Sequence, residues 1–460
     1  MTLLEQLYAW QTSHAILFGA DTASYCLDQR RRYQGQALAV ARPKDTEQVQ
    51  QLVRLCAEHG VAIVPQGGNT SLCGAATPLS SGQSLIISFE RMKQIVRVDA
   101  DNNTMIVQAG VTLAQVQQAA LAANRLFPAN WAAAASCQIG GALATNAGGV
   151  NVLRYGNMRE LTLGLEVVLA SGEVWDGLRG LRKDNTGYDL KQLFVGSEGT
   201  LGLITQAVLR LYPLPTAHAT ALVAVENPAA AIDLLRGLQA EVGDRITSFE
   251  LISAPCLDLL KKHFPRLAQP FDSIPAWCVL IELSDGGETA ALIDRLAEYL
   301  FAHGCIDAYV AQSASEAADF WLLRESIPDA QRVEGVSIKH DISLPIGVIP
   351  DFLRVCGAEL IAHFSGANIV AFGHLGDGNL HYNLFLADQT AGVYMQEHAV
   401  NEIVYRHVAA LNGSISAEHG IGQLKRESLQ QARPALELAM MRQIKAALDP
   451  LGIFNPGKVL

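Results

Sequence analysis

The sequence predicts an α+β protein with more than one domain. At 460 residues, the chain is longer than one hydrophobic core usually serves, so two or three domains are expected. Three glycine-rich clusters separated by strand-like runs occupy its first half. Beyond Pro213-Leu-Pro215, two similar strand–helix–strand units favour a cap domain with an antiparallel sheet and helices on one face.

The domain boundaries are predicted from composition and from proline punctuation. Pro213-Leu-Pro215 marks the end of the glycine-rich half, because paired prolines interrupt regular structure. The predicted segments are an N-terminal helical segment (1–36), a glycine-rich domain (37–215), a cap domain (216–425) and a C-terminal segment that returns to the glycine-rich domain (426–460).

Helix and strand signals follow one another along the chain. A helix over residues 45–59 is expected to end at Gly60, and Thr112 is expected to cap a helix over residues 113–124. The expected strands of the first half cover residues 61–64, 95–99, 104–108, 161–169 and 207–211. The other expected helices lie near residues 228–242, 287–303, 350–365 and 393–411, and a long one runs from 425 to 448.

Composition narrows the class of protein. Half of the residues are apolar and 17% are charged, which is typical of a well-packed globular chain. The net charge of −11 disfavours nucleic acid and anionic membranes as partners. The chain shows neither a signal peptide nor an apolar run of about 18 residues, and its eight cysteines form no Cys-x-x-Cys pair. We therefore expect a soluble, cytoplasmic protein without disulfides.

The glycine clusters suit a ligand that carries phosphate. The first, residues 65–74, lacks the usual dinucleotide and nucleoside-triphosphate fingerprints, but its glycines allow close backbone approach and its polar residues add donors. A tight turn without a ligand would explain this cluster equally well. The second, residues 132–149, is too rich in small residues to fill a core, so a planar cofactor with a pyrophosphate is expected against it. A third follows at residues 195–204.

Two histidines flank a predicted hairpin in the second half. Asp377-Gly378 is a strong two-residue turn signal, and folding about it places His374 opposite His381. Opposed Cβ atoms lie about 4.5–5.5 Å apart, so the two imidazoles could chelate a divalent metal. Asn383 points the same way by the two-residue period of a strand. Histidines that cap the turn and bond to backbone are the alternative.

A second polar motif, Glu418-His419, comes before a glycine turn. Glu418 could supply the oxygen that completes a His/His/Glu metal set, and His419, which projects elsewhere, would then be free for proton transfer. A surface pair is the alternative. Arg324 lies on an expected amphipathic helix, where a solvated position is the common outcome, and Lys339 could simply pair with Asp341.

The glycine clusters together resemble the FAD-binding domain of the vanillyl-alcohol-oxidase-type flavoproteins. The resemblance rests on Pro65-Gln-Gly-Gly-Asn-Thr, on Ile139-Gly-Gly with Thr145-Asn-Ala-Gly-Gly, and on Gly196-Ser-Glu-Gly-Thr-Leu-Gly. It implies two α+β subdomains with FAD between them. Several relatives tether FAD through a histidine where this chain has Asn69, so non-covalent FAD is expected. The cofactor-binding residues that it implies are Pro65, Gln66, Gly67, Gly68, Asn69, Thr70, Ser71, Gly74, Ser136, Ile139, Gly140, Gly141, Thr145, Asn146, Gly148, Gly149, Glu198, Gly202, Ile204 and Asn455.

The second half is similar to the D-2-hydroxyglutarate and D-lactate dehydrogenase branch of these flavoproteins. The motifs are Trp321-Leu-Leu-Arg-Glu, Lys339-x-Asp-x-Ser-Leu-Pro, Gly373-His-Leu-Gly-Asp-Gly-Asn-Leu-His, Ser416-Ala-Glu-His-Gly-Ile-Gly and Phe454-Asn-Pro-Gly-Lys. By this resemblance a metal, Zn²⁺ or a similar ion, is held by His374, His381 and Glu418. The substrate residues that it implies are Arg324, Lys339, Asn383 and His419, with His419 as the catalytic base.

The expected reaction is FAD-dependent, metal-assisted oxidation of a D-2-hydroxy acid to the 2-oxo acid. D-2-hydroxyglutarate or a related dicarboxylate such as D-malate is the expected substrate, with an electron-transfer flavoprotein or a quinone as external acceptor. Pro328 stands where the 2-hydroxyglutarate enzymes carry a threonine, so a D-lactate or glycolate-type dehydrogenase is the alternative. A flavin-free metal-binding scaffold and a nicotinamide-dependent dehydrogenase are the further rivals. A homodimer is compatible with the sequence.

Overall fold

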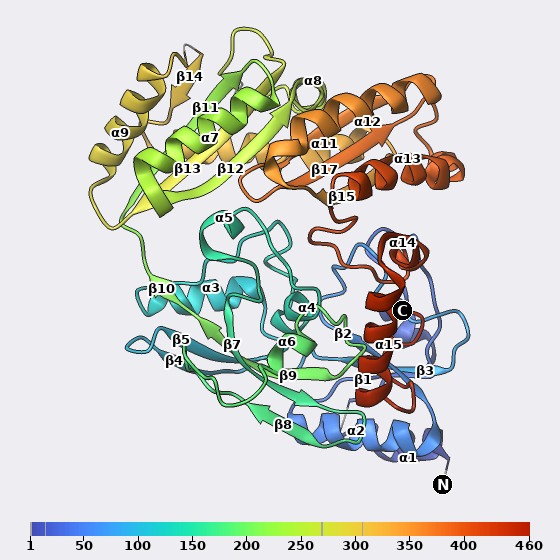
Figure 1. Ribbon diagram of the computed structural model, residues 1–460. Coiled ribbons are helices and arrows are strands. Elements are labelled where there is room, and N and C mark those ends of the chain that lie inside the picture. The colour runs from blue at the N-terminus through green and yellow to red at the C-terminus, as the bar shows by residue number, and fades with distance from the viewer. Residues whose placement is uncertain (1, 14, 268–269, 306) are drawn as a thin grey trace. The chain divides into compact units, whose positions relative to one another are not determined.

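The computed structural model describes residues 2–13, 15–267, 270–305 and 307–460. The chain forms two compact units, each with its own hydrophobic core (Figure 1). The glycine-loop unit consists of Met1–Gly148, Gly156–Leu214 and Glu418–Leu460, and the cap unit consists of Gly149–Tyr155 and Pro215–Ala417.

The glycine-loop unit contains three sheets. A parallel three-stranded sheet has the order β1-β3-β2, and an antiparallel five-stranded sheet has the order β4-β5-β9-β7-β8. A short antiparallel pair joins β10 to β6. The strands are β1 (Ala39–Ala41), β2 (Ala62–Gln66), β3 (Ser84–Ser88), β4 (Ile95–Asp99), β5 (Thr104–Gln108), β6 (Arg125–Leu126), β7 (Thr162–Val168), β8 (Val174–Gly177), β9 (Leu203–Arg210) and β10 (Tyr212–Pro213).

Capping residues set the ends of the main helices in this unit. The Asp45 side chain accepts from the Gln48 N–H at the start of α2, and Gly60 ends that helix in the left-handed conformation. Thr112 caps α3 in the same way, so both predicted helix ends are confirmed. The helices are α1 (Leu3–Ala9), 3₁₀-helix η1 (Gly19–Cys26), α2 (Thr46–His59), α3 (Leu113–Ala122), α4 (Ile139–Ala144), α6 (Lys191–Phe194), α14 (Arg426–Ala432) and α15 (Ala435–Leu448).

The C-terminal helix is interrupted, which corrects one expectation. The sequence predicts a single helix from residue 425 to 448, whereas α14 ends at Ala432 and α15 begins at Ala435. Pro434 lies between them, where its missing N–H and its ring prevent the helix from continuing.

The cap unit is built on one antiparallel sheet of seven strands. Their order is β14-β11-β13-β12-β16-β17-β15. The strands are β11 (Ala217–Val225), β12 (Ile246–Ser253), β13 (Trp277–Asp285), β14 (Ala308–Val310), β15 (Ile338–Ser343), β16 (Asn368–His374) and β17 (Asn379–Phe385). The last four strands of this order carry the polar residues considered below.

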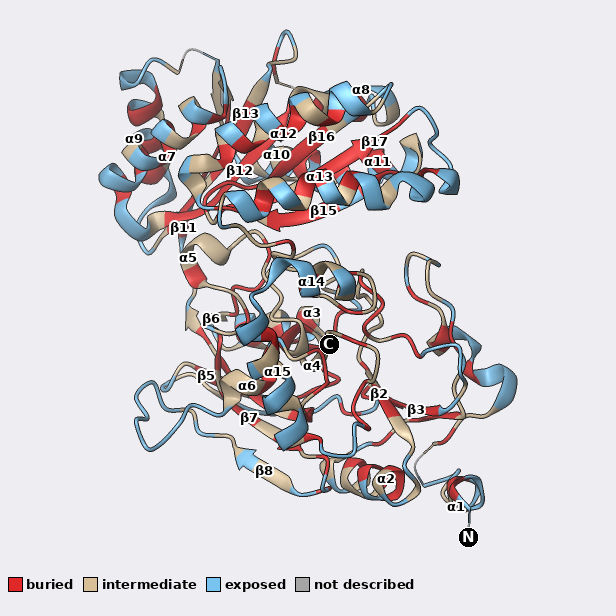
Figure 2. Cartoon of the chain, turned by 45° about the vertical axis from the view of Figure 1, so that its right-hand side comes forward, coloured by how far each residue is buried: buried red, intermediate tan, exposed pale blue. Residues whose placement is uncertain are grey.

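Helices cover both faces of the cap sheet, so the expectation of helices on one face is wrong. One core joins the sheet to α7, α9, α12 and α13, and a second core on the opposite face joins it to α8, α10 and α11 (Figure 2). Consecutive residues of β11 point to opposite faces of the sheet, and both faces are buried there. Leu222 belongs to one core and Val223 to the other. The helices are α5 (Val152–Tyr155), α7 (Pro228–Val242), η2 (Gly243–Arg245), α8 (Ala254–His263), α9 (Thr289–Ala302), α10 (Ala314–Glu325), α11 (Ile327–Glu334), η3 (Ile346–Val348), α12 (Ile349–His363), η4 (Ala391–Gln396) and α13 (Glu397–Ala410).

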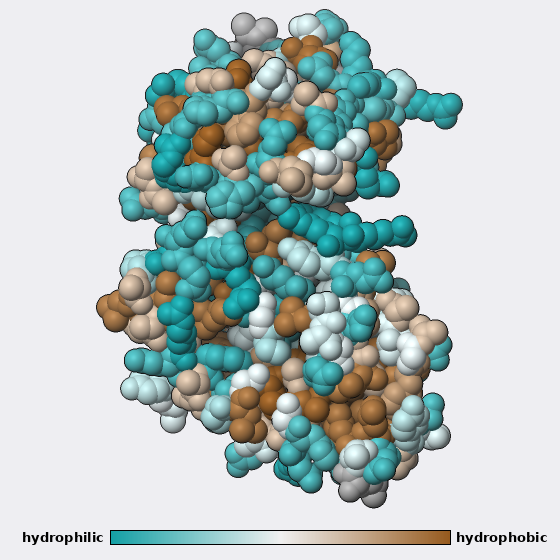
Figure 3. All heavy atoms as spheres, turned by 90° about the vertical axis from the view of Figure 1, so that its right-hand side faces the viewer, coloured by the Kyte–Doolittle hydropathy of each residue, from teal (hydrophilic) through white to brown (hydrophobic). Residues whose placement is uncertain are grey.

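Hydrophilic side chains are spread over the face of the molecule drawn in Figure 3, interrupted by smaller hydrophobic patches. Within the described part of the chain, no helix is both long enough and apolar enough to cross a bilayer.

Candidate active site

The two histidines come from adjacent strands joined by a short loop. Strand β16 ends at His374 and β17 begins at Asn379, so residues 375–378 form the connection. The register pairs Phe372 with His381. The predicted two-residue turn, with His374 directly opposite His381, is therefore wrong. The residue opposite His381 lies two positions earlier in the chain, at Phe372.

The two histidine rings are neighbours despite this error. Side chains alternate between the faces of a strand, so a shift of two residues keeps a side chain on the same face. The ring centroids of His374 and His381 lie 5.6 Å apart. This face of the sheet is the one covered by α8, α10 and α11, because Phe372 belongs to the core on that side.

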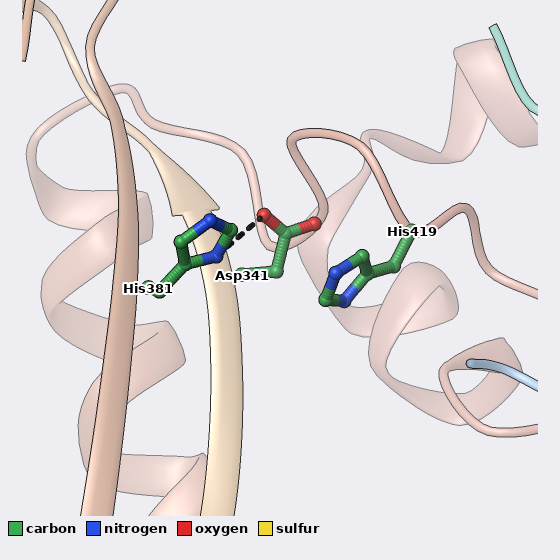
Figure 4. Close-up of side chains that lie close together, drawn as sticks. All are labelled: Asp341, His381 and His419. Carbon is green, nitrogen blue, oxygen red and sulfur yellow. Dashed lines mark ion pairs between the residues drawn. The ribbon is translucent and has the colours of Figure 1, made fainter. Parts of the chain in front are cut away.

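Each histidine stands beside a carboxylate on the next strand outward. Glu250 of β12 is the register partner of His374, and its Oε1 lies 2.6 Å from the histidine Nδ1. Asp341 of β15 is the register partner of His381, with 3.8 Å between Asp341 Oδ1 and His381 Nδ1 (Figure 4). Four adjacent strands thus carry a carboxylate, two imidazoles and a second carboxylate.

Glu250 also binds the arginine that the sequence singled out. Arg324 of α10 donates from Nε to Glu250 Oε2 at 2.8 Å and forms an ion pair with it, with 2.7 Å between Nη2 and Oε2. Its guanidinium lies over the ring of Phe372. Burial raises the pKa of Glu250, but the interactions of its carboxylate with His374 and Arg324 outweigh burial and hold that pKa below its usual value. The alternative of a solvated Arg324 is wrong, since this residue is buried.

Asn383 and Lys339 occupy the next register pair along β17 and β15. Asn383 is buried and donates from Nδ2 to Gln331 Oε1 of α11 at 2.9 Å, whereas Lys339 is exposed. Both lie two residues from the polar row, so strand alternation directs them to the same face as His381 and Asp341.

Glu418 and His419 follow directly from the cap unit. The unit ends at Ala417, whose backbone N–H donates to the Asp341 carbonyl oxygen at 3.2 Å. Glu418 and His419 are the next two residues after Ala417 in the chain. Each of the following groups has its prospective ligand atoms within 4.8 Å of one another: His374, His381 and Glu418 in one, and Asp341, His381 and His419 in the other. In Figure 4 the Asp341 carboxylate lies between the imidazoles of His381 and His419.

The first group has the composition of a catalytic metal site. Two imidazoles and one carboxylate leave coordination positions for substrate, as in sites that bind Zn²⁺ with three protein ligands. His374 Nδ1 is bonded to Glu250, so its Nε2 is the nitrogen available to a metal. The donors fit a divalent ion.

Glycines bring the first and second glycine clusters into direct contact. A Cβ on Gly68 would lie 1.9 Å from the carbonyl oxygen of Ser136 in the second cluster. A Cβ on Gly140 would lie 2.7 Å from the Cβ of Ala109, so the second cluster also packs closely against the residue that follows β5. Larger residues would push these segments apart. Gly141 differs, because an added Cβ there meets nothing within 4 Å and so faces open space. Closely packed glycine loops beside the open space at Gly141 are compatible with a bound ligand.

The third cluster is tied to the second. The Glu198 N–H donates to the Ala144 carbonyl at 2.7 Å, and its carboxylate accepts from the backbone N–H groups of Ile421 and Gly422. Burial raises the pKa of Glu198, and these donors oppose the rise. Close packing explains why residue 202 is a glycine, since an added Cβ there would lie 2.6 Å from the side chain of Val167.

The remaining predicted cofactor residues line the same loops. Asn69 and Asn146 adopt positive φ, Asn69 Nδ2 donates to the Leu27 carbonyl, and Thr145 Oγ1 donates to the Gly141 carbonyl. Gly149 falls on the cap side of the division between the units. The other positions, Pro65, Gln66, Gly67, Thr70, Ser71, Gly74, Ile139, Gly148 and Ile204, lie in or beside β2, α4 and β9.

Buried polar atoms in the glycine-loop unit also fit a polar cofactor. Within the described residues, Gln138 Oε1, Thr77 Oγ1, Asn455 Oδ1 and Lys458 Nζ are buried without a hydrogen-bond partner. Such atoms are rare in folded proteins unless a ligand or water satisfies them. Nδ2 of Asn455 donates to the carbonyl oxygens of Ala75 and Glu198. These two bonds fix the orientation of the side-chain amide, and therefore the position of Oδ1. Burial and the nearby Arg426 lower the pKa of Lys458 to about 7.

Comparisons with known proteins agree with this geometry. A family model described as FAD linked oxidases, C-terminal domain, matches residues 214–459, and one described as FAD binding domain matches residues 37–177. The chain belongs to the FAD-linked oxidases. The predicted oxidoreductase class and its cofactor, FAD, are thereby confirmed.

Curated relatives place this FAD-linked oxidase in the predicted branch. It is 38% identical to the mitochondrial D-2-hydroxyglutarate dehydrogenase of Danio rerio over 94% of this chain and 80% of the relative. It is 37% identical to the D-2-hydroxyglutarate dehydrogenase of Xanthomonas citri pv. viticola, over 96% and 93% of the two chains. The enzyme of that name from Stutzerimonas stutzeri is 35% identical, over 99% and 98%. Because the fish relative is named mitochondrial, the cytoplasmic location stays a prediction.

Solved structures confirm the fold class of this FAD-linked oxidase. A structure of p-cresol methylhydroxylase with substrate bound aligns with a TM-score of 0.78 at 17% identity, covering 99% of this chain and 96% of the other. A structure of alkyldihydroxyacetonephosphate synthase aligns with a TM-score of 0.75 at 18% identity, covering 99% and 85%. At such identities the likeness concerns the fold alone.

Proposed function

We propose that this FAD-linked oxidase converts a D-2-hydroxy acid to the 2-oxo acid with the help of a divalent metal. D-2-hydroxyglutarate or a related dicarboxylate such as D-malate is the proposed substrate. The observation that carries the proposal is the group formed by His374, His381 and Glu418, in a chain whose relatives are named D-2-hydroxyglutarate dehydrogenase. A hydroxyl and an adjacent carboxylate oxygen form a chelating pair suited to the open positions of such an ion.

The proposed roles follow from the chemistry of each side chain. His374, His381 and Glu418 would hold the metal, which would supply Lewis-acid polarisation of the substrate hydroxyl. His419 takes the hydroxyl proton, because imidazole titrates near neutral pH and its neighbour Glu418 is occupied as a ligand. FAD, when bound, supplies the oxidant that accepts the hydrogen from the substrate α-carbon as a hydride.

Substrate carboxylates require positive charge that the acidic chain lacks overall. Arg324 and Lys339 are proposed to supply it, and Asn383 is proposed to donate a hydrogen bond to the substrate. The guanidinium of Arg324 uses its Nε and Nη2 edge for Glu250, which leaves the opposite edge, at Nη1, as the one to meet a carboxylate.

One observation favours a monocarboxylate as the second candidate substrate. Pro328 occupies the first turn of α11. The resemblance to the 2-hydroxyglutarate enzymes implies a threonine at this position. Proline has neither a hydroxyl nor an N–H to offer a distal carboxylate. A D-lactate or glycolate-type activity is therefore the alternative.

FAD is proposed to bind without a covalent bond, because Asn69 stands where the resemblance places the tethering histidine of some relatives. An amide cannot form that linkage. Reoxidation is assigned to an external acceptor, either an electron-transfer flavoprotein or a quinone.

Anaerobic bleaching of the flavin tests the substrate assignment. D-2-hydroxyglutarate, D-malate, D-lactate and glycolate are mixed separately with the holoenzyme in a stopped-flow instrument, with L-2-hydroxyglutarate as the matched control. The proposal predicts the fastest reduction with a D-dicarboxylate and none with the L-enantiomer. Fastest reduction by D-lactate would select the alternative, and no bleaching by any of these acids would contradict the proposed reaction class.

A further inference from the structure

We propose that Glu250 is a positioning residue that orients two parts of the active site with a single carboxylate. Its Oε1 holds His374, a proposed metal ligand, and its Oε2 holds Arg324, a proposed carboxylate-binding residue. This inference rests on the proposed function, because it assigns Glu250 a role only where His374 binds a metal. It adds a residue that lies outside the three-ligand group and outside the substrate residues.

The contact with His374 fixes which ring nitrogen faces the metal. An ionised carboxylate only accepts hydrogen bonds, so Nδ1 of His374 must carry the proton across the 2.6 Å contact. Nε2 then keeps its lone pair, which a metal requires. A carboxylate behind a ligating imidazole also sets the ring orientation and makes the nitrogen more basic.

The pairing of two adjacent strands brings Glu250 and His374 together. Glu250 and His374 are direct register partners on β12 and β16, where opposed side chains lie about 4.5–5.5 Å apart at Cβ. The side chain of Glu250 is completely buried. Neither residue can therefore turn away to water and leave the other without a partner.

The contact with Arg324 balances the charge of the buried carboxylate. The guanidinium donates from Nε to Oε2, and its Nη2 lies 2.7 Å from the same oxygen in an ion pair. The Phe372 ring lies against the guanidinium, with 4.8 Å between Arg324 Cζ and the ring centroid. A buried charge that loses its partner is strongly destabilising, so Arg324 and Glu250 each need the other. With Nε and Nη2 both held at Oε2, the direction of the remaining edge of the guanidinium is fixed as well.

One strand position thereby couples the proposed metal centre to the proposed carboxylate site. A shift of Glu250 moves the imidazole that holds the ion and the guanidinium that holds the substrate together.

Glu282 provides a matched control for this carboxylate. It lies on β13, next to β12, and its Oε2 accepts from Trp321 Nε1 of the same helix α10 at 2.6 Å. Burial raises its pKa. Replacing it also removes a carboxylate that bonds to α10, but it makes no contact with a histidine in the described structure.

The experiment measures Zn²⁺ affinity of the FAD-loaded protein by competition with a chromophoric chelator, together with the unfolding temperature. Four proteins are compared: wild type, Glu250→Gln, Glu282→Gln and the double variant Glu250→Gln with Arg324→Gln. We expect Glu250→Gln to weaken Zn²⁺ binding by about 10–100-fold, as loss of such a carboxylate typically does. Glu282→Gln is expected to stay within about 2-fold of wild type, because its carboxylate touches no ligand.

The double variant separates positioning from folding. Removing both charges eliminates the unpaired guanidinium, so the unfolding temperature should recover toward wild type while Zn²⁺ affinity stays low. Recovery of both would show that the effect of Glu250→Gln came from the unpaired arginine, and would overturn the inference. Unchanged affinity in Glu250→Gln would overturn it also, while the proposed metal site would stand. If the wild type itself binds no Zn²⁺, the metal-assisted function fails, and the role of Glu250 fails with it.

Discussion

His419 carries the most chemically demanding role in the proposed reaction, and its substitution tests that role at the scale of one residue. His419→Ala removes the proposed base but no metal ligand, so FAD and metal should remain bound. Loss of a positioned base slows proton transfer by about 10²–10⁴-fold, and we expect flavin reduction to slow by that factor. Stopped-flow absorbance during anaerobic mixing with D-2-hydroxyglutarate measures it.

His398→Ala is the control for this substitution. His398 is an exposed histidine on α13, so the variant removes an imidazole from the surface only. It should reduce its flavin at the wild-type rate. Near wild-type reduction in His419→Ala as well would exclude His419 as the base.

The sequence was informative about single residues where strand alternation or an unusual residue type marked them. His374 and His381 were assigned to one face, and their rings lie 5.6 Å apart in the folded chain. Glu250 and Asp341 were not assigned to the site. The sequence carries a signal for Glu250, which stands between the apolar residues Phe249 and Leu251 of an expected strand, because a buried charge there must be paired. Its partners were not predictable, because they lie on β16 and α10, far along the chain.

At the scale of an element, the hairpin of β16 and β17 depends on one glycine. Gly373 has φ +147°, and a Cβ there would lie 2.6 Å from the Asn379 carbonyl oxygen. Gly373→Ala should therefore strain the hairpin by about 1–3 kcal/mol and displace the adjacent His374. We predict a lower unfolding temperature together with weaker Zn²⁺ binding, measured by calorimetry and chelator competition.

Gly347→Ala is the matched control in the same unit. A Cβ at Gly347 meets nothing within 4 Å, and its φ lies outside the positive range, so the substitution should change neither quantity appreciably. Equal behaviour of the two variants would contradict the role assigned to the hairpin glycine.

Elements were predictable where their signals are local. Asp45, Gly60 and Thr112 act within one helical turn, and these helix ends agree with the structure. The hairpin register was wrong because Asp377-Gly378 turns the chain within a longer loop, and turn residues alone do not fix loop length. A second layer of cap helices was not predicted, although the uninterrupted apolar run of residues 221–225 in β11 is typical of a strand buried on both faces.

At the scale of the whole molecule, the fold class was predictable from combined motifs and not from any one of them. Each glycine cluster alone is compatible with a tight turn, and the resemblance of three clusters together indicated the flavoprotein fold. Contacts such as Gly68 against Ser136, or Asn455 against Glu198, join segments that local patterns treat separately. The metal-ligand group likewise draws on residues about 40 positions apart, so its formation required tertiary structure.

The central claim is that a metal held by His374, His381 and Glu418 is needed for oxidation of the substrate. Its most direct test is the rate of anaerobic flavin reduction by D-2-hydroxyglutarate before metal removal, after dialysis against a chelator, and after restoration with Zn²⁺. FAD content is measured in parallel, so that loss of cofactor is not mistaken for loss of metal. We predict a decrease of about 100-fold or more on metal removal, and recovery on restoration. An unchanged rate in the metal-free holoenzyme would contradict the account.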